Sequence, residues 1–140
     1  MEDEEKLKEE TDDGLLAHLN ACHDTCMNAV MYSLHQGGDF AKVDHIRSLL
    51  DCAQFCTVAT DFYIRDSETA GEILNLCAEI CDESADSCEL FFEDQAMKDC
   101  AEVCRNCSKI CQDAVEEVEE DFEDLVDDED QDSEEIEENK

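Results

Sequence analysis

Small and apolar residues recur at steps of three and four along four stretches of this 140-residue chain. Such steps return to one face of an α-helix, because the helix completes a turn every 3.6 residues. The pattern predicts four helices over residues 14–36, 40–65, 67–91 and about 93–118. Proline is absent, and Gly37-Gly38 stand between the first two stretches, where glycine readily ends a helix.

Each predicted helix shows an inward face that contains a Cys-x-x-x-Cys pair. The four faces are Leu15, Leu19, Cys22, Cys26, Ala29, Ser33; His45, Leu49, Cys52, Cys56, Ala59, Tyr63; Ala70, Leu74, Cys77, Cys81, Ser84, Cys88, Phe91; and Met97, Cys100, Cys104, Cys107, Cys111, Ala114, Val118. The links between the stretches are only a few residues long, so neighbouring helices must run antiparallel. We therefore expect an all-α, up-down-up-down antiparallel four-helix bundle. In it, Asp39 and Ser67 would begin the second and third helices.

The net charge of −33 is concentrated at the two ends of the chain. We expect an acidic N-terminal arm over residues 1–13, the bundle over 14–118 and an acidic, largely disordered tail over 119–140. The negative field excludes nucleic acid and anionic membranes as partners. No apolar run reaches the roughly 20 residues that span a membrane, and the acidic start is unlike a signal peptide. These features predict a cytoplasmic protein; whether the acidic tail serves solubility, high salt or docking stays open.

Eleven cysteines in one short chain require an explanation. Cysteine can be a small buried core residue, and twin pairs can staple helices through disulfides in oxidising compartments. Zinc prefers closed four-ligand sites, whereas the one Cys-x-x-Cys spacing here, Cys104 to Cys107, falls inside a predicted helix. The proline-terminated run of a ferredoxin-like iron–sulfur site is absent. A zinc or iron–sulfur redox protein and a disulfide-stapled scaffold remain as alternatives.

Cu(I) fits the thiol pattern best. Thiolates select this soft ion, and cysteines one turn apart have Cβ atoms about 5–6 Å apart, close enough to share it. One Cu(I) per thiolate leaves a neutral array, so burying it costs far less than burying charged four-thiolate zinc sites. The sequence predicts a non-enzymatic protein that binds and stores several Cu(I) ions, because no nucleotide loop or catalytic pair is found.

The four Cys-x-x-x-Cys registers and the quartet at residues 100, 104, 107 and 111 resemble the copper storage proteins. The resemblance covers about residues 15–115 and is closest to the cytosolic members of that family. It implies a homotetramer that holds many Cu(I) ions along the bundle core. The implied ligands are Cys22, Cys26, Cys52, Cys56, Cys77, Cys81, Cys88, Cys100, Cys104, Cys107 and Cys111. Ala, Ser or Tyr at other inward positions implies a lower capacity than in richer members.

One end of the predicted bundle gathers weaker copper ligands. The end of the first helix, the start of the second, the end of the third and the start of the fourth meet there. This end brings together His35, His45, Met97, Cys88 and Cys100, with Met31 one turn inside. Imidazole and thioether hold Cu(I) less tightly than thiolate, which suits entry and release. We expect His45 and Met97 to be metal ligands at this entrance.

Overall fold

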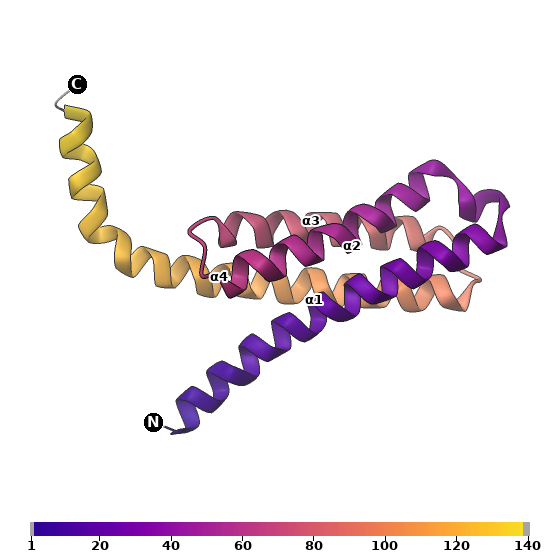
Figure 1. Ribbon diagram of the computed structural model, residues 1–140, viewed down its shortest axis with the longest axis horizontal. Coiled ribbons are helices and arrows are strands. Elements are labelled where there is room, and N and C mark those ends of the chain that lie inside the picture. The colour runs from indigo at the N-terminus through magenta and orange to yellow at the C-terminus, as the bar shows by residue number, and fades with distance from the viewer. Residues whose placement is uncertain (1, 139–140) are drawn as a thin grey trace.

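The computed structural model shows long helices that lie side by side (Figure 1). The helices are α1 (Glu2–Gln36), α2 (Val43–Ile64), α3 (Ala70–Glu89) and α4 (Gln95–Glu138), and a short 3₁₀ helix, η1 (Gly38–Ala41), separates α1 from α2. The structure describes residues 14–118, side chains included. The predicted acidic arm at 1–13 and the tail at 119–140 lie outside the described residues, so both stay predictions.

The helices form the expected antiparallel bundle. α1 packs against α2 and α4, and α3 packs against the same two helices on the other side. No strand occurs in the part of the chain that the structure describes. Within that part, no helix combines the length and the apolar character needed to cross a membrane. The predicted all-α, up-down-up-down fold is therefore confirmed.

The predicted inward faces form the core almost completely. Every position named for the four faces is buried except Tyr63, Phe91 and Val118, which are half-buried. The two ends of the core differ: Leu15, Leu19 and Leu74 close one end, and residues such as His45 and Met97 fill the other. Burying a leucine contributes about 1.5–3 kcal/mol, so the apolar end anchors the bundle. The cysteines occupy the length between these ends.

The starts of two helices differ from the prediction. Asp39 lies in η1 and forms an ion pair with Lys42 at 3.1 Å, and α2 begins at Val43. Gly37 and Gly38 both have positive φ, as expected for residues that end a helix, and the tight turn they make uses residues 38–41. The Ser67 hydroxyl accepts a hydrogen bond from the Thr69 N–H, which holds a turn before α3 begins at Ala70.

α3 is also shorter than predicted at its C-terminal end, so the link between α3 and α4 is longer. α3 ends at Glu89, so Phe91 belongs to the turn and not to the helix. The Asp94 carboxylate accepts a hydrogen bond from the Met97 N–H at 2.9 Å and caps the start of α4. Because this cap fixes the first turn of α4, it also sets the rotation that points Met97 into the core.

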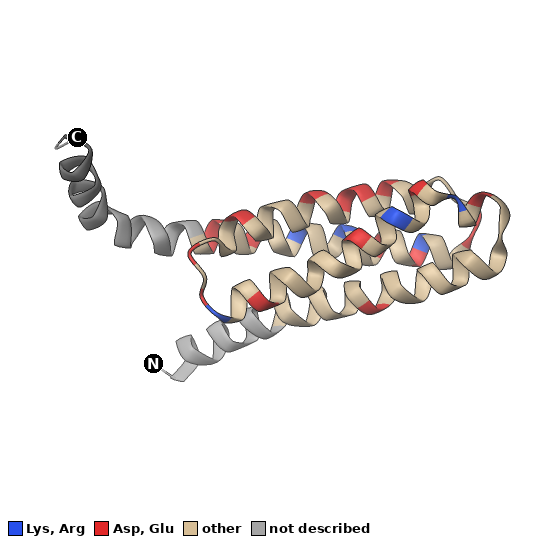
Figure 2. Ribbon diagram, turned by 45° about the horizontal axis from the view of Figure 1, so that its top comes forward, with Lys and Arg blue, Asp and Glu red and all other residues tan. Residues whose placement is uncertain are grey.

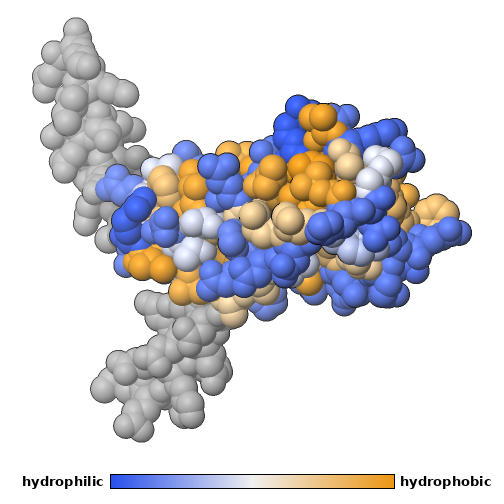
Figure 3. Space-filling model, turned by 45° about the vertical axis from the view of Figure 1, so that its right-hand side comes forward, coloured by the Kyte–Doolittle hydropathy of each residue, from blue (hydrophilic) through white to orange (hydrophobic). Residues whose placement is uncertain are grey.

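Charge is distributed unevenly over the described bundle (Figure 2). Between residues 14 and 36, α1 has one carboxylate, Asp24, and no Lys or Arg, whereas acidic residues are frequent along α3 and α4. Arg105 of α4 forms ion pairs with Asp82, Asp86 and Glu89 of α3. These pairs join the two most acidic faces of the bundle. The face seen in Figure 3 is mostly hydrophilic, with apolar side chains gathered in a patch.

Candidate metal centre

The cysteine side chains are all buried in the core of the bundle. All eleven are free thiols, and none is more than 1% exposed. Each helix contributes them from its inward face, because steps of three and four keep the residues on one side of the helix. Free thiols in this arrangement do not support the disulfide-stapled alternative.

Sulfur atoms contact each other across the helices. The Cys22 Sγ lies 3.6 Å from the Cys52 Sγ and 3.9 Å from the Cys104 Sγ, which links α1 to both of its neighbours. The Cys26 and Cys104 sulfurs are also 3.6 Å apart. On the other side of the core, the Cys81 Sγ lies 3.6 Å from Cys52 and 4.0 Å from Cys77. The contacts thus continue from α1 through α2 to α3 and α4.

Two groups of four sulfurs have the spacing of a metal site. In each group, the sulfur atoms all lie within 4.8 Å of one another; the groups are Cys22, Cys26, Cys52, Cys104 and Cys22, Cys52, Cys56, Cys81. Because Cys22 and Cys52 belong to both groups, two separate closed four-thiolate sites cannot form there at once. Shared sulfurs instead suit ions that take two or three ligands and accept bridging thiolates, as Cu(I) does.

Hydrogen bonds between the thiols raise the pKa of some cysteines and lower the pKa of others. The pKa of Cys104 is lowered, because the Cys100 thiol and then the Cys22 thiol donate hydrogen bonds that stabilise its thiolate. The pKa of Cys22 and that of Cys52 are raised, first by their hydrogen bond to Cys104 and further by burial. The pKa of Cys107 is lowered in the same way, first by Cys111 and then by Cys22. Without metal, negative charge is therefore drawn to Cys104 and Cys107, and Cys22 and Cys52 keep their protons at neutral pH.

A serine takes the place of one sulfur in the α3 column. Ser84 is fully buried, and its hydroxyl oxygen lies 3.6 Å from the Cys104 sulfur, within hydrogen-bond distance. The hydroxyl is a harder and weaker ligand for a soft ion than a thiolate would be. The chain therefore loses one soft ligand next to Cys104 and retains a polar contact.

His45 and Met97 lie in the core at the end predicted for copper entry. His45 is only 4% exposed, and Met97 is fully buried. The His45 Nδ1 lies 2.7 Å from the Ser87 Oγ, and its Nε2 lies 3.3 Å from the Ser33 Oγ. The Ser33 hydroxyl in turn donates a hydrogen bond to the Met97 sulfur at 3.9 Å. Burial lowers the pKa of His45, so its ring is neutral at neutral pH and able to ligate a metal.

Aromatic side chains cover this end of the bundle. The Phe91 ring packs 4.8 Å from the His45 ring and stacks on Phe40 of η1 at 4.3 Å. The Tyr32 hydroxyl donates a hydrogen bond to the Asp94 carboxylate at 2.5 Å, which ties α1 to the turn before α4. An ion that enters here must pass these side chains, and one serine must release His45 before the ring can bind it.

Two other residues predicted for the entrance point elsewhere. His35 and Met31 are both exposed, and Met31 is 55% exposed, so neither lies inside the bundle end. The reason is rotational: Met31 follows the buried Val30 and precedes the inward Ser33, which puts it on the outer side of α1. Cys88 and Cys100 are buried as expected.

Sequence reasoning did not identify the hydroxyl partners of His45. The helical spacing predicts Ser33 as an inward position without a thiol, and it does not place Ser87 on any inward face. Both contacts join residues on different helices, so no local spacing predicts them. A polar residue on an otherwise apolar inward face, such as Ser33 or His45, was the one available signal, because buried polar groups need partners.

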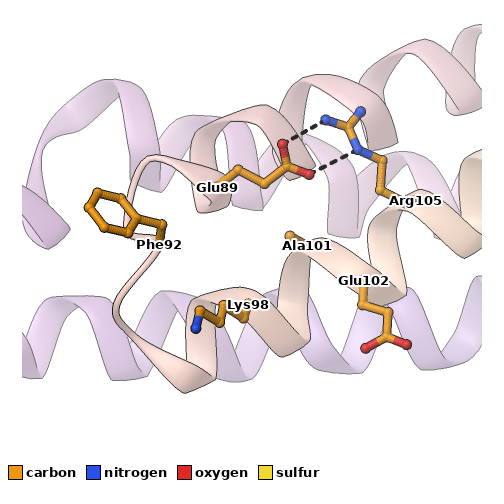
Figure 4. A pocket seen from close by; sticks show the side chains of 6 residues that line it. All are labelled: Glu89, Phe92, Lys98, Ala101, Glu102 and Arg105. Atoms are coloured by element: carbon orange, nitrogen blue, oxygen red, sulfur yellow. Dashed lines mark hydrogen bonds and ion pairs between the residues drawn. The ribbon is translucent and has the colours of Figure 1, made fainter.

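The surface pocket between α3 and α4 does not compete with the sulfur core as a site. A pocket of about 360 Å³ lies between α3 and α4 and is lined by Glu89, Phe92, Lys98, Ala101, Glu102 and Arg105 (Figure 4). In this pocket, the Arg105 guanidinium is already paired with Glu89 at 3.1 Å. It contains neither a thiol nor an imidazole and offers no soft ligand.

Comparison with known proteins places this geometry in a family. The family model described as "Csp: Copper storage protein" matches residues 8–116. A search of curated proteins by sequence gave no match.

Similar solved structures have the same fold. One is a crystal structure of a protein from Nitrosospira multiformis that is 30% identical in sequence. The match covers 76% of this chain and 96% of that protein's chain, with a TM-score of 0.70. The Cu(I)-bound copper storage protein BsCsp3 is 23% identical over 74% of this chain and 96% of its own, with a TM-score of 0.68. Apo copper storage protein 3 from Bacillus subtilis is also 23% identical, and the match covers 74% of this chain and 97% of that protein's chain, with a TM-score of 0.65. With the family model matching most of the sequence, this chain belongs to the copper storage protein family.

Proposed function

We propose that this protein stores several Cu(I) ions in the cytoplasm, on the thiolates that line its bundle core. The observation that carries the proposal is the continuous set of sulfur contacts of 3.6–4.0 Å across all four helices. Thiolate–metal bonds of about 2.3 Å place ligand sulfurs about 4 Å apart, so small movements of the thiols would admit ions. All eleven cysteines, with His45 and Met97 at the entrance, are the proposed ligands.

Charge balance supports Cu(I) as the cargo. The core around the sulfurs is made of Ala and Leu and has no cationic side chain among the described buried residues. A monovalent ion on each thiolate leaves this region neutral, whereas a four-thiolate zinc site keeps two negative charges in a dry core. Each Cu(I) that binds Cys22 or Cys52 must displace a proton, so loading should release acid.

The wider proposal concerns assembly and role. We propose a homo-oligomer, a tetramer by resemblance to the family, and a storage role without catalysis. Family membership supports the storage role. Copper ions are the proposed partner, and nucleic acid and membranes are excluded by the charge of −33.

An anaerobic titration tests the proposal. Cu(I) is added to the reduced apo protein in the presence of a competing chelator, and tightly bound ions are counted per chain. We expect a count of several ions, with a ceiling near the number of thiols, eleven. Saturation at one or two ions, or a preference for zinc under the same competition, would contradict storage of Cu(I).

Two core variants sharpen the count. Cys104→Ala and Cys107→Ala should each lower the number of Cu(I) ions bound, while helical circular dichroism stays unchanged, because alanine fits an inward helical position. Ala59→Ser, at an inward position without sulfur, is the matched control and should leave the count unchanged. Loss of the helical signal in the cysteine variants would show that the thiols are needed for folding instead.

A further inference from the structure

The outer side of α1 carries a second row of copper ligands that the core does not use. His23, Met27, Met31 and His35 follow one another at steps of four, so they lie on one side of the helix. Met27 is 41% exposed and Met31 is 55% exposed; the His23 side chain is 40% exposed. Thioether and imidazole are both ligands of Cu(I).

We propose that His23, Met27, Met31 and His35 form a surface track that binds Cu(I) weakly and reversibly. Each neighbouring pair is one turn apart, with Cβ atoms about 5–6 Å apart, and thioether side chains are long and flexible enough to bring both donors to one ion. Two-ligand sites suit Cu(I), which does not require a closed tetrahedron. The track rests on the proposed function, since it presumes that Cu(I) is the cargo.

A hydrogen bond prepares the first residue of the track for a metal. The His23 Nδ1 lies 2.9 Å from the Asp24 carboxylate, so Nδ1 carries the proton and Nε2 is left as the free donor. A histidine that binds metal commonly makes this contact to a carboxylate, which fixes the ring and its tautomer. Asp24 is the one carboxylate between residues 14 and 36 of α1, and its hydrogen-bond partner is His23.

The position of the track fits a route toward the core. It begins beside Cys22 and Cys26, whose side chains point inward, and it ends at His35, next to the turn that leads to His45. The net charge of −33 attracts cations to the whole molecule, and the weak ligands of the track would hold them near the entrance. No oxidation or bond cleavage is involved; ligand exchange moves Cu(I) between donors.

Apolar contact with a second copy of the chain is the competing explanation for this surface. Met27, Met31 and Leu34 are exposed, and so is Leu50 of α2. Leucine could serve such an interface as well as methionine, and an interface does not need a histidine at either end of the row. The use of sulfur and imidazole at all four steps therefore favours the metal track.

Methionine methyl NMR tests the proposal on the full chain. The protein has four methionines, of which Met97 is buried in the core and Met1 lies outside the described bundle. With ¹³C-methyl methionine, anaerobic Cu(I) is added first to saturate the core, as counted by chelator competition, and then in excess. We expect the Met27 and Met31 methyl signals to shift during the second phase, after Met97 has stopped changing.

Two variants separate the metal track from an apolar interface. Met27→Leu with Met31→Leu removes sulfur and keeps the apolar surface, so it should abolish the second phase and leave core loading and oligomeric state unchanged. Leu34→Ser with Leu50→Ser should leave the second phase intact. If the core loads but the Met27 and Met31 signals never shift in excess Cu(I), the track is wrong. If Met27→Leu with Met31→Leu abolished the oligomer as well as the second phase, the track would also be overturned. That result would assign this surface to contact with a second copy of the chain. Failure of the core to load would instead refute the storage function.

Discussion

Cys104 is the residue at which side chains from three helices converge. Its sulfur contacts Cys22 and Cys26 of α1 and lies 3.6 Å from the Ser84 hydroxyl oxygen of α3. Hydrogen bonds from Cys100 and Cys22 lower the pKa of Cys104, and the same network raises the pKa of its neighbours. At the residue scale, negative charge is thus favoured at particular sulfurs, Cys104 and Cys107 among them, where Cu(I) can bind without displacing a proton.

The raised pKa of Cys52 predicts how apo stability depends on pH. Cys52 stays protonated in the fold, so its contribution to stability is fully present below the unfolded thiol pKa of about 8.5 and is lost as pH rises above it. Denaturant unfolding of the reduced apo protein should show a decline in that alkaline range, and Cys52→Ala should make the decline shallower. An equally steep decline in the variant would contradict the assignment.

His45 and Met97 allow a test of the entrance. His45→Gln with Met97→Leu keeps polar contacts and core volume but removes both weak ligands, so Cu(I) loading should slow while the final count changes only by ions held there. Stopped-flow transfer from a Cu(I) chelator measures the rate. His18→Gln, at the other end of α1, is the control and should load at the normal rate. Unchanged kinetics in the double variant would remove the entrance from this end.

At the scale of whole helices, one cation on the surface supports the pairing of α3 with α4. Arg105 bridges Asp82, Asp86 and Glu89, which α3 presents along one side at helical spacing. The Arg105 side chain is 38% exposed, so solvent screens each pair, but without the guanidinium three carboxylates would face one another.

Arg105→Ala should therefore lower the free energy of unfolding by about 1 kcal/mol, and by less at high salt. Chemical denaturation of the reduced apo protein at low and high salt measures both effects. Lys109→Ala, one turn further along α4, is the control, because Lys109 has no ion pair among the described residues. A loss that does not shrink in salt would indicate packing by the arginine stem instead.

The whole molecule carries far more negative charge than its fold can pair. Forty-two acidic residues face nine Lys and Arg, which leaves a net charge of −33. Self-repulsion of this size opposes the compact state, and salt weakens it because the Debye length falls to about 8 Å at 0.15 M. Association of chains would bring such fields together, so α1, with one carboxylate between residues 14 and 36, is the least repulsive side of the bundle.

We accordingly expect the melting temperature of the apo protein to rise as monovalent salt is added. Differential scanning calorimetry across a salt series, with the reductant held constant, measures it. Sedimentation velocity on the same samples separates screening within the chain from association of chains. A melting temperature that is flat or falls with salt would show that the acidic residues do not repel one another across the fold.

The sequence by itself determined the helices, their antiparallel order and which residues point inward. It could do so because helical periodicity is local: steps of three and four assign Cys22 and Cys26, or Cys100 and Cys104, to one face before any contact is known. Only the tertiary structure decided which sulfurs meet, as in the Cys22–Cys52 and Cys26–Cys104 contacts, and which hydroxyls hold His45. These pairings depend on the rotation and axial offset of each helix, which packing and the turns at Gly38–Ala41 and Phe91–Asp94 set together. The outward position of Met31, in contrast, follows from local periodicity, because the inward positions Ala29 and Ser33 leave Met31 on the outer side of α1.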